Sequence, residues 1–284
     1  MADTAIALKS NAQNWLPEPK KLFIGGKWVD AVSGKTFDVL DPSTGKVIAA
    51  VAAGEKEDID LAVKAARKAF DGEKWSGMTT SQRGLVIHKI GDLILENVAE
   101  FAELESLDNG KPITISTAAD VPLSADLFHY MSGWATKIEG NTIPISTSGI
   151  YAPGTNFLSY TLREPVGVIG QIIPWNFPLL MAAWKLGPVL ATGNCVVLKP
   201  APQTPLTAIR LAEIMQETEV RASPINVLKL DAVKEGCQLF TSQRAYPRPC
   251  HIHPTIRTAD ASSCIVEPPY SATFEGQTTA YTVV

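Results

Sequence analysis

The sequence has little cysteine, little excess charge and no long apolar run, and each shortage excludes a class of protein. Four cysteines in 284 residues are too few for a disulfide-rich scaffold. A net charge of −4 provides no broad basic surface for nucleic acid. The sequence contains no run of roughly 18 apolar residues, the length that a helix needs to cross a bilayer. The polar start of the chain lacks the apolar segment of a secretory signal. We therefore expect a cytoplasmic protein with no nucleic-acid partner and no membrane partner.

The first half of the chain combines short strands with amphipathic helices. Residues 1–20 are polar and are expected to form a flexible arm. Two patterns predict the elements that follow, namely β-rich runs broken by glycine turns and apolar residues at helical spacing. The expected strands, which together form a small β-meander, cover 23–29, 37–40 and 47–51, and the expected helices cover 58–71, 79–101 and 123–138.

The second half shows strands and helices in alternation. Residues 166–173 are almost continuously apolar, as in a strand buried on both faces of a parallel sheet. A helix over 177–190, a second buried strand over 195–198 and a helix over 206–217 follow. This alternation predicts an α/β fold with an incomplete doubly wound parallel sheet, preceded by the helical and β-meander segment.

Ligands of such sheets bind beyond the carboxyl ends of the strands. Asn176 follows the first buried strand, and Lys199 ends the second. Asn176 has two possible roles, as the N-cap of the next helix or as an amide donor to a developing oxyanion. Lys199 is either a solvated surface charge, which is the common case, or a ligand-binding group.

The pattern breaks after Glu219. Residues 225–227 could form one strand, but prolines and polar residues dominate the rest, so 221–284 is expected to be an irregular tail without an assigned domain. The cysteines and histidines of this tail do not match the spacing of structural zinc sites. We therefore expect no metal site. Cys195 belongs to a buried strand and is interpreted as a core residue.

Three segments carry a specific family resemblance. From Arg163 to Ala201 the chain reads REPVGVIGQIIPWNFPLLMAAWKLGPVLATGNCVVLKPA, and earlier segments read FIGGKWVDAVSGKTFDVLDPSTGKVIAAV and LDNGKPI. These segments resemble the amino-terminal part of the NAD(P)-dependent aldehyde dehydrogenase superfamily over about residues 22–218. Residues 221–284 do not resemble it.

The resemblance implies an enzyme that oxidises a small-molecule aldehyde to a carboxylic acid with NAD or NADP. In that family a cysteine thiolate attacks the aldehyde, hydride passes to the nicotinamide, and a glutamate activates the water that hydrolyses the thioester. The resemblance implies that residues 141–159 are an oligomerisation arm of a homo-oligomer, and that 21–140 and 160–220 form part of a dinucleotide-binding domain. It assigns the oxyanion amide to Asn176, the ribose contact to Lys199, and the lining of the cofactor site to Ile172, Ile173, Pro174 and Trp175.

Two departures from the family pattern affect this expectation. Pro202 stands where members that prefer NAD often carry a glutamate bonded to the ribose, so we expect weak discrimination between NAD and NADP. The segments that carry the family's catalytic cysteine and glutamate are not found. The alternative is a catalytically inactive dinucleotide-binding or assembly remnant, from a truncated or frame-shifted reading frame.

Overall fold

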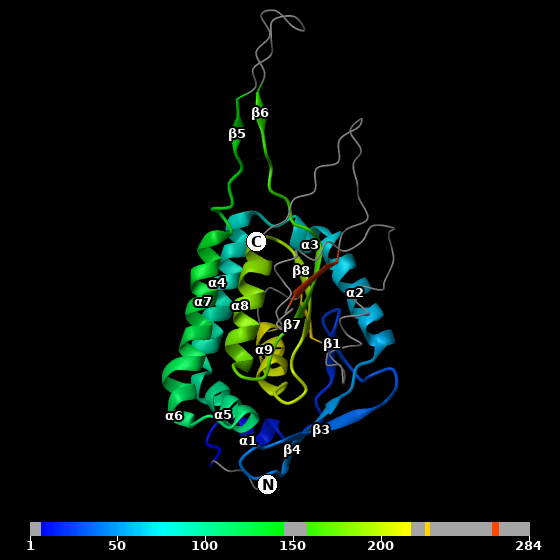
Figure 1. The fold of residues 1–284 in the computed structure, drawn as a ribbon, viewed down its shortest axis with the longest axis vertical. Helices are drawn as coiled ribbons and strands as arrows, with labels where there is room; N and C mark the ends of the chain where they lie inside the picture. The colour runs from blue at the N-terminus through cyan, green and yellow to red at the C-terminus, as the bar shows by residue number, and fades with distance from the viewer. Residues whose placement is uncertain (1–6, 145–157, 217–224, 228–262, 267–284) are drawn as a thin grey trace, which may run out of the picture.

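The structure, a computed structural model, describes residues 7–144, 158–216, 225–227 and 263–266 as an α/β fold (Figure 1). Within these residues the main sheet has six strands in the order β10-β7-β8-β9-β1-β2. Three parallel strands lie at its centre, namely β7 (Val168–Ile172), β8 (Cys195–Lys199) and β9 (Ile225–Val227). The flanking strands are β10 (Ser263–Val266), β1 (Leu22–Ile24) and β2 (Lys27–Val29).

The sheet is mixed, which corrects the expectation of a purely parallel sheet. β10 pairs antiparallel with β7, and β1 pairs antiparallel with both β9 and β2. A two-residue turn, Gly25 and Gly26 with positive φ, joins β1 to β2, and so short a connection permits only antiparallel pairing. β9 confirms the strand expected at 225–227. β10 corrects the expectation of a wholly irregular tail. The sequence did not reveal this strand because four residues are too few to show a period.

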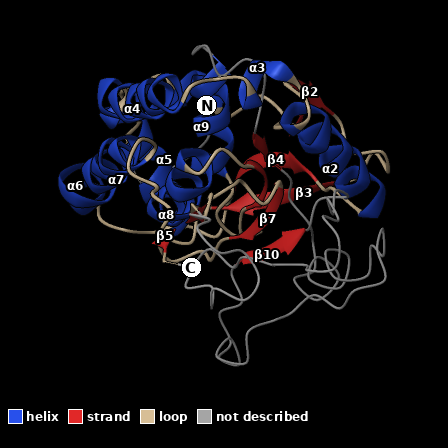
Figure 2. Cartoon of the chain, turned by 90° about the horizontal axis from the view of Figure 1, so that it is seen from above, coloured by secondary structure: helices blue, strands red, loops and turns tan. Residues whose placement is uncertain are grey.

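Helices cover both sides of the sheet (Figures 1 and 2). On one side α2 (Lys56–Phe70) packs against β1, β7, β8 and β9. On the other side α8 (Pro178–Ala191) packs against β8, and α9 (Leu206–Gln216) packs against β9. An outer pair, α4 (Thr80–Glu96) and α7 (Val121–Trp134), covers α8. Burial from both sides explains why all five residues of β8 are buried and why its sequence is apolar.

The single helix expected over 79–101 is two helices in the structure. Thr79 caps α4, since its hydroxyl accepts the Gln82 N–H. The helix ends at Glu96. The next residue, Asn97, leaves the helical backbone region, and its side-chain amide donates to the carbonyl of Leu93 at 2.8 Å. The chain then starts α5 (Val98–Asn109), which is buried along most of its length. The apolar spacing continues across this break and therefore could not reveal it.

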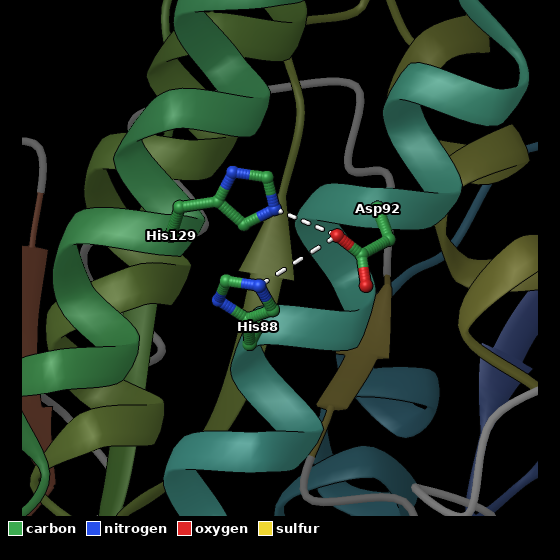
Figure 3. A group of neighbouring side chains, drawn as sticks. All are labelled: His88, Asp92 and His129. Carbon is green, nitrogen blue, oxygen red and sulfur yellow. Dashed lines mark hydrogen bonds and ion pairs between the residues drawn. The ribbon is translucent and has the colours of Figure 1, made fainter.

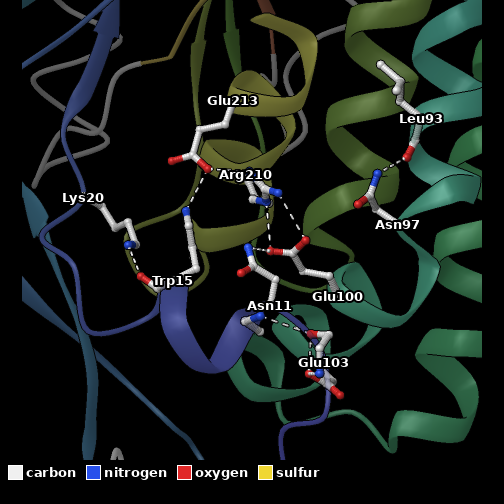
Figure 4. A network of polar contacts seen from close by, with 11 residues as sticks. Asn11, Trp15, Lys20, Leu93, Asn97, Glu100, Glu103, Arg210 and Glu213 are labelled. Carbon is white, nitrogen blue, oxygen red and sulfur yellow. Dashed lines mark hydrogen bonds and ion pairs between the residues drawn. The ribbon is translucent and has the colours of Figure 1, made fainter. Parts of the chain in front are cut away.

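Residues 7–20 pack against the body of the protein, which corrects the expectation of a flexible arm over that part. The Ser10 hydroxyl donates to Glu103 at 2.6 Å. The indole of Trp15 donates to Glu213 at 2.7 Å, and Figure 4 shows this pair. The segment includes a one-turn helix, and its polar groups donate to carboxylates on α5 and α9, of which Glu103 is buried and Glu213 half-buried. The remaining elements are α1 (Ala12–Trp15), β3 (Thr36–Leu40), β4 (Val47–Ala52), α3 (Glu73–Ser76), α6 (Ile113–Ile115), the π-helix η1 (Ser116–Asp120), β5 (Thr142–Ile143) and β6 (Ser159–Tyr160).

The β-meander expected over 23–51 is instead two separate hairpins. β3 pairs only with β4 in the described residues, and β2 belongs to the main sheet. The outer edge of β4 is occupied by Lys20, which accepts from Ala52 N–H and donates its own N–H to the Ala50 carbonyl, both at 2.8 Å. β5 and β6 form a third hairpin that projects from the body (Figure 1). No helix in the described part of the chain is long and apolar enough to cross a membrane.

Candidate functional site

The carboxyl ends of β7 and β8 lie side by side. The two strands are parallel, and the register places Ile172 beside Lys199. The ladder continues one residue further, because Ile173 N–H donates to the Lys199 carbonyl at 3.0 Å. The parallel pairing expected from the sequence is therefore confirmed. As a consequence, the two segments that carry the candidate residues leave the sheet at the same edge.

The segment after β7 is largely exposed. Ile173 is buried at 2% exposure and Ile172 is half-buried, whereas Pro174, Trp175 and Asn176 face solvent. Trp175 is 58% exposed, an unusual amount for so large an apolar ring. An exposed aromatic ring beside a sheet edge offers an apolar surface to a flat ligand.

Asn176 does not cap the helix that follows. α8 begins at Pro178, and Phe177 occupies the N-cap position without a side-chain hydrogen bond. Among the described residues no hydrogen bond engages the Asn176 side chain. The N-cap interpretation is therefore wrong, and the amide is left exposed near the positive end of α8.

Lys199 is buried, with 1% of its surface exposed. The interpretation as a solvated surface charge is therefore wrong. Its Nζ lies 3.5 Å from the Pro200 carbonyl. Pro202, three residues further, is half-buried.

The end of α5 supports the loop after β7. The Asn109 side-chain amide donates to the Trp175 carbonyl at 2.7 Å. The Lys111 ammonium lies 3.5 Å from the centre of the Phe177 ring, a cation–π contact, and also pairs with Asp120 at 2.6 Å. These contacts from Asn109 and Lys111 hold the loop in place and leave the Trp175 ring exposed.

Two buried carboxylates of α5 bind the starts of the helices that follow β7 and β8. Glu105 Oε2 accepts the Leu179 N–H of α8 at 3.3 Å, and Asp108 Oδ2 accepts the Leu206 N–H of α9 at 2.8 Å. Carboxylates at helix amino termini satisfy free N–H groups and complement the helix dipole. One helix thus orients both helices that follow the candidate residues.

Burial raises the pKa of Glu105 from 4.5 to about 7, although the Leu179 N–H and the Lys111 charge act to lower it. Burial also raises the pKa of the Cys195 thiol to about 12. Cys195 is therefore a core residue, as expected, and its thiol is not available as a thiolate near neutral pH. The other cysteines lie outside the residues whose side chains are described.

Sequence reasoning missed the supporting residues of the site. Glu105, Asp108, Asn109 and Lys111 all fall in or beside the LDNGKPI segment, which was noted only as a resemblance. Their positions alone gave no clear signal, because α5 carries four acidic residues, Glu100, Glu103, Glu105 and Asp108, and only the structure shows that Glu105 and Asp108 bind the starts of α8 and α9. Met181, on α8, packs against the core, whereas Trp184 is 51% exposed.

Comparison with known proteins agrees with this geometry. The model of the aldehyde dehydrogenase family matches residues 28–245. Over 220 residues the chain is 50% identical to the mitochondrial aldehyde dehydrogenase of Homo sapiens, which covers 76% of this chain and 41% of that protein. It is 51% identical over 219 residues to the mitochondrial aldehyde dehydrogenase family 2 member B4 of Arabidopsis thaliana. That match covers 77% of this chain and 39% of the relative.

A solved relative has the same fold. The NAD+ complex of an aldehyde dehydrogenase from Bacillus cereus superposes with a TM-score of 0.76 at 44% identity, over 83% of this chain and 46% of that one. The chain therefore spans less than half the length of these relatives. The family match also extends past residue 218, where the motif resemblance was expected to end, and includes β9. By sequence over most of its length, and by fold, this chain belongs to the aldehyde dehydrogenase family.

Proposed function

We propose that the α/β part of this chain binds NAD or NADP where β7 and β8 end, and that it supplies the cofactor side of an enzyme that oxidises aldehydes to carboxylic acids. The observation that carries the proposal is the parallel register that places Ile172 beside Lys199. Dinucleotides bind at this edge of open α/β sheets. In domain terms, 21–140 and 160–220 form a Rossmann-like, partial dinucleotide-binding domain, whose sheet also includes β9 and β10; the rest of 221–284 remains unassigned.

Lys199 would hydrogen-bond the adenosine ribose. Its ammonium group is buried at the end of β8, so a ribose hydroxyl that reached it would make a charge-assisted hydrogen bond shielded from water. Four neighbouring residues would line the site, with the exposed indole as the largest apolar surface, and these are Ile172, Ile173, Pro174 and Trp175.

Asn176 would stabilise the negative oxygen that forms when a thiolate attacks the aldehyde. Its amide is exposed and is not used as a helix cap, so its N–H₂ group is available to donate. The start of α8 adds a positive dipole in the same region. When bound, the dinucleotide would accept the hydride that leaves the substrate carbon.

The two candidate functions differ in whether the chain supplies a cysteine thiolate that attacks the aldehyde. Cys195 cannot supply it, because burial holds its pKa near 12. Cys237 and Cys250 lie outside the described residues, and Cys264 lies on β10 at the far edge of β7. The alternative function is a dinucleotide-binding or assembly protein without catalysis.

Pro202 would leave the choice between NAD and NADP weakly determined. A proline side chain neither accepts a hydrogen bond from the ribose nor repels a 2′-phosphate. We expect the two dissociation constants to differ by less than about tenfold, or 1.4 kcal/mol.

The β5–β6 hairpin is the described base of the proposed oligomerisation arm, whose central residues lie outside the described part of the chain. Its large apolar side chains are exposed, with Leu158 at 78% and Tyr160 at 58%. Exposed apolar residues on a projecting hairpin are typical of a surface that another subunit covers. We therefore propose a homo-oligomer in which this hairpin contacts another subunit.

The test uses the purified full chain. NAD and NADP are titrated by calorimetry, and then an aliphatic or aromatic aldehyde is added while the absorbance of the reduced cofactor is followed. Binding with turnover supports the enzyme. Binding without turnover supports the alternative, and failure of both dinucleotides to bind refutes the proposed site.

A further inference from the structure

Two helices outside the proposed cofactor site bring two imidazoles and a carboxylate together (Figure 3). His88 and Asp92 lie one turn apart on α4, and His129 reaches them from α7. The His129 Nε2 atom lies 3.0 Å from Asp92 Oδ1, and the His88 Nε2 atom lies 3.8 Å from the same oxygen. The three ligand atoms all lie within 4.8 Å of one another. Such a convergence is a side-chain cluster with the donors of a metal site.

The spacing of these atoms is close to that of a tetrahedral site. Ligand atoms at ~2.1 Å from a zinc ion lie roughly 3.4 Å apart. The separations of 3.0 and 3.8 Å from Asp92 Oδ1 bracket this value, and the two imidazole nitrogens lie within 4.8 Å of each other, so side-chain rotations that draw the imidazoles together would place the three atoms around one ion. His88 is exposed, so the outer side of the cluster is open to a fourth, solvent ligand.

The packing of α4 on α7 holds the His129 ring in place. A Cβ atom at Gly91 would lie 2.5 Å from His129 Nε2, so the glycine provides the space that the imidazole fills. On α7 the Ser132 hydroxyl lies 3.5 Å from His88 Nδ1 and donates to the His129 carbonyl at 2.6 Å. A polar partner at the second ring nitrogen is a common feature of metal-binding histidines.

We propose that His88, Asp92 and His129 bind a divalent transition-metal ion, with zinc as the ion that the donor set and spacing suit best. Two imidazoles and one carboxylate suit zinc and its neighbours, whereas magnesium and calcium take oxygen ligands. The ion would join α4 to α7 and so stabilise the outer helix pair. The sequence expectation of no metal site did not consider this cluster, because His129 lies 37 residues after Asp92.

The competing explanation is a metal-free cluster. In it Asp92 simply accepts a hydrogen bond from His129, and the two imidazoles stack with ring centres 4.3 Å apart. This explanation predicts that the three residues confer no metal affinity, whatever their effect on stability.

The experiment uses the full chain, stripped of metal by a chelator and dialysed. Zinc is titrated in competition with a chromophoric chelator, and the melting temperature is measured with and without zinc. We expect one zinc ion to bind at this cluster and to raise the melting temperature. His88→Gln and His129→Gln should each weaken binding at least about tenfold, and Asp92→Asn should weaken it in the same direction.

Two controls isolate the site. The double variant His251→Gln/His253→Gln removes the tail's imidazoles and should leave zinc binding at the cluster unchanged. Gly91→Ala should displace the His129 ring and the facing backbone of α7, which the added Cβ would meet at 2.5 and 2.9 Å, and so weaken binding. Gly133→Ala should not, because a Cβ there would meet only the flexible end of Lys137 at 3.3 Å. Far-UV circular dichroism establishes that each variant is folded.

Three results would overturn the proposal. These are no zinc binding by the native chain, binding that survives both His88→Gln and His129→Gln in folded protein, and binding that disappears in the tail double variant. None of these results depends on cofactor binding, so the metal site and the proposed function fail or succeed separately.

Discussion

The Glu105 carboxyl group should make the stability of this chain depend on pH. It lies fully buried on α5, and burial raises its pKa from 4.5 to about 7. Because the folded-state pKa is the higher one, the native chain binds this proton more tightly than the unfolded chain. The stabilisation is complete below about pH 4.5 and is lost as the pH rises through about 7. A shift of this size corresponds to ~3 kcal/mol.

Glu105→Gln should remove this dependence. Glutamine has nearly the same shape, carries no charge, and can still accept the Leu179 N–H through its amide oxygen. Relative to the native chain, the free energy of unfolding of the variant should rise by about 2 to 3 kcal/mol between pH 5 and pH 8. The opposing contribution is the helix cap, since an ionised carboxylate at the start of α8 stabilises by about 1 kcal/mol, which is less than the penalty of burial.

The assay is urea unfolding at several pH values, followed by tryptophan fluorescence with Glu139→Gln, at an exposed position, as the control. A difference between variant and native chain that stays constant from pH 5 to pH 8 would refute the reasoning. So would a variant less stable than the native chain at pH 8, because that result would mean that the cap outweighs burial.

Three further predictions follow from the same structure. Asp108→Ala removes the acceptor for the Leu206 N–H and should lower the free energy of unfolding by about 2 kcal/mol. Asp108→Asn keeps an acceptor oxygen and should lower it less, so equal losses for the two variants in urea unfolding would contradict the proposed helix cap. Pro202→Glu should shift the ratio of the NADP and NAD dissociation constants at least about tenfold towards NAD, because the carboxylate would repel a 2′-phosphate; an unchanged ratio in calorimetry would place residue 202 away from the ribose. Leu158→Ser/Tyr160→Ser should reduce the assembled fraction in light scattering, and an unchanged mass would show that the hairpin is not part of the interface.

The central strands and their helices were predictable from the sequence because burial on both sides makes a continuous apolar signal. Residues 166–173 and 195–198 carried that signal, and the structure confirms their parallel pairing. The mixed character of the sheet was not predictable, because the direction of β1 and β10 depends on which strand edges are free after the centre has formed. Residues 7–20 read as polar and flexible for a related reason, since their partners Glu103 and Glu213 are distant in sequence.

The candidate site was likewise predictable only in part. Asn176 and Lys199 were predictable as candidates because they follow buried strands, but their environments were not. The exposed amide and the buried ammonium are both the reverse of the common case for their positions. The roles of Glu105 and Asp108 depend on contacts 74 and 98 residues away in sequence, which no local pattern records.

The most direct test of the proposed cofactor site is the affinity for NAD of Lys199→Met, with Lys20→Met as the matched control. Both lysines are buried, at 1% and 4% exposure, and methionine preserves most of the apolar stem of each. Lys20 contacts Trp15 and lies in the N-terminal segment. Loss of a charge-assisted hydrogen bond to the ribose should weaken NAD binding at least about tenfold in Lys199→Met and leave it unchanged in Lys20→Met. Equal affinity for NAD in the native chain and a folded Lys199→Met variant would contradict the proposed cofactor site.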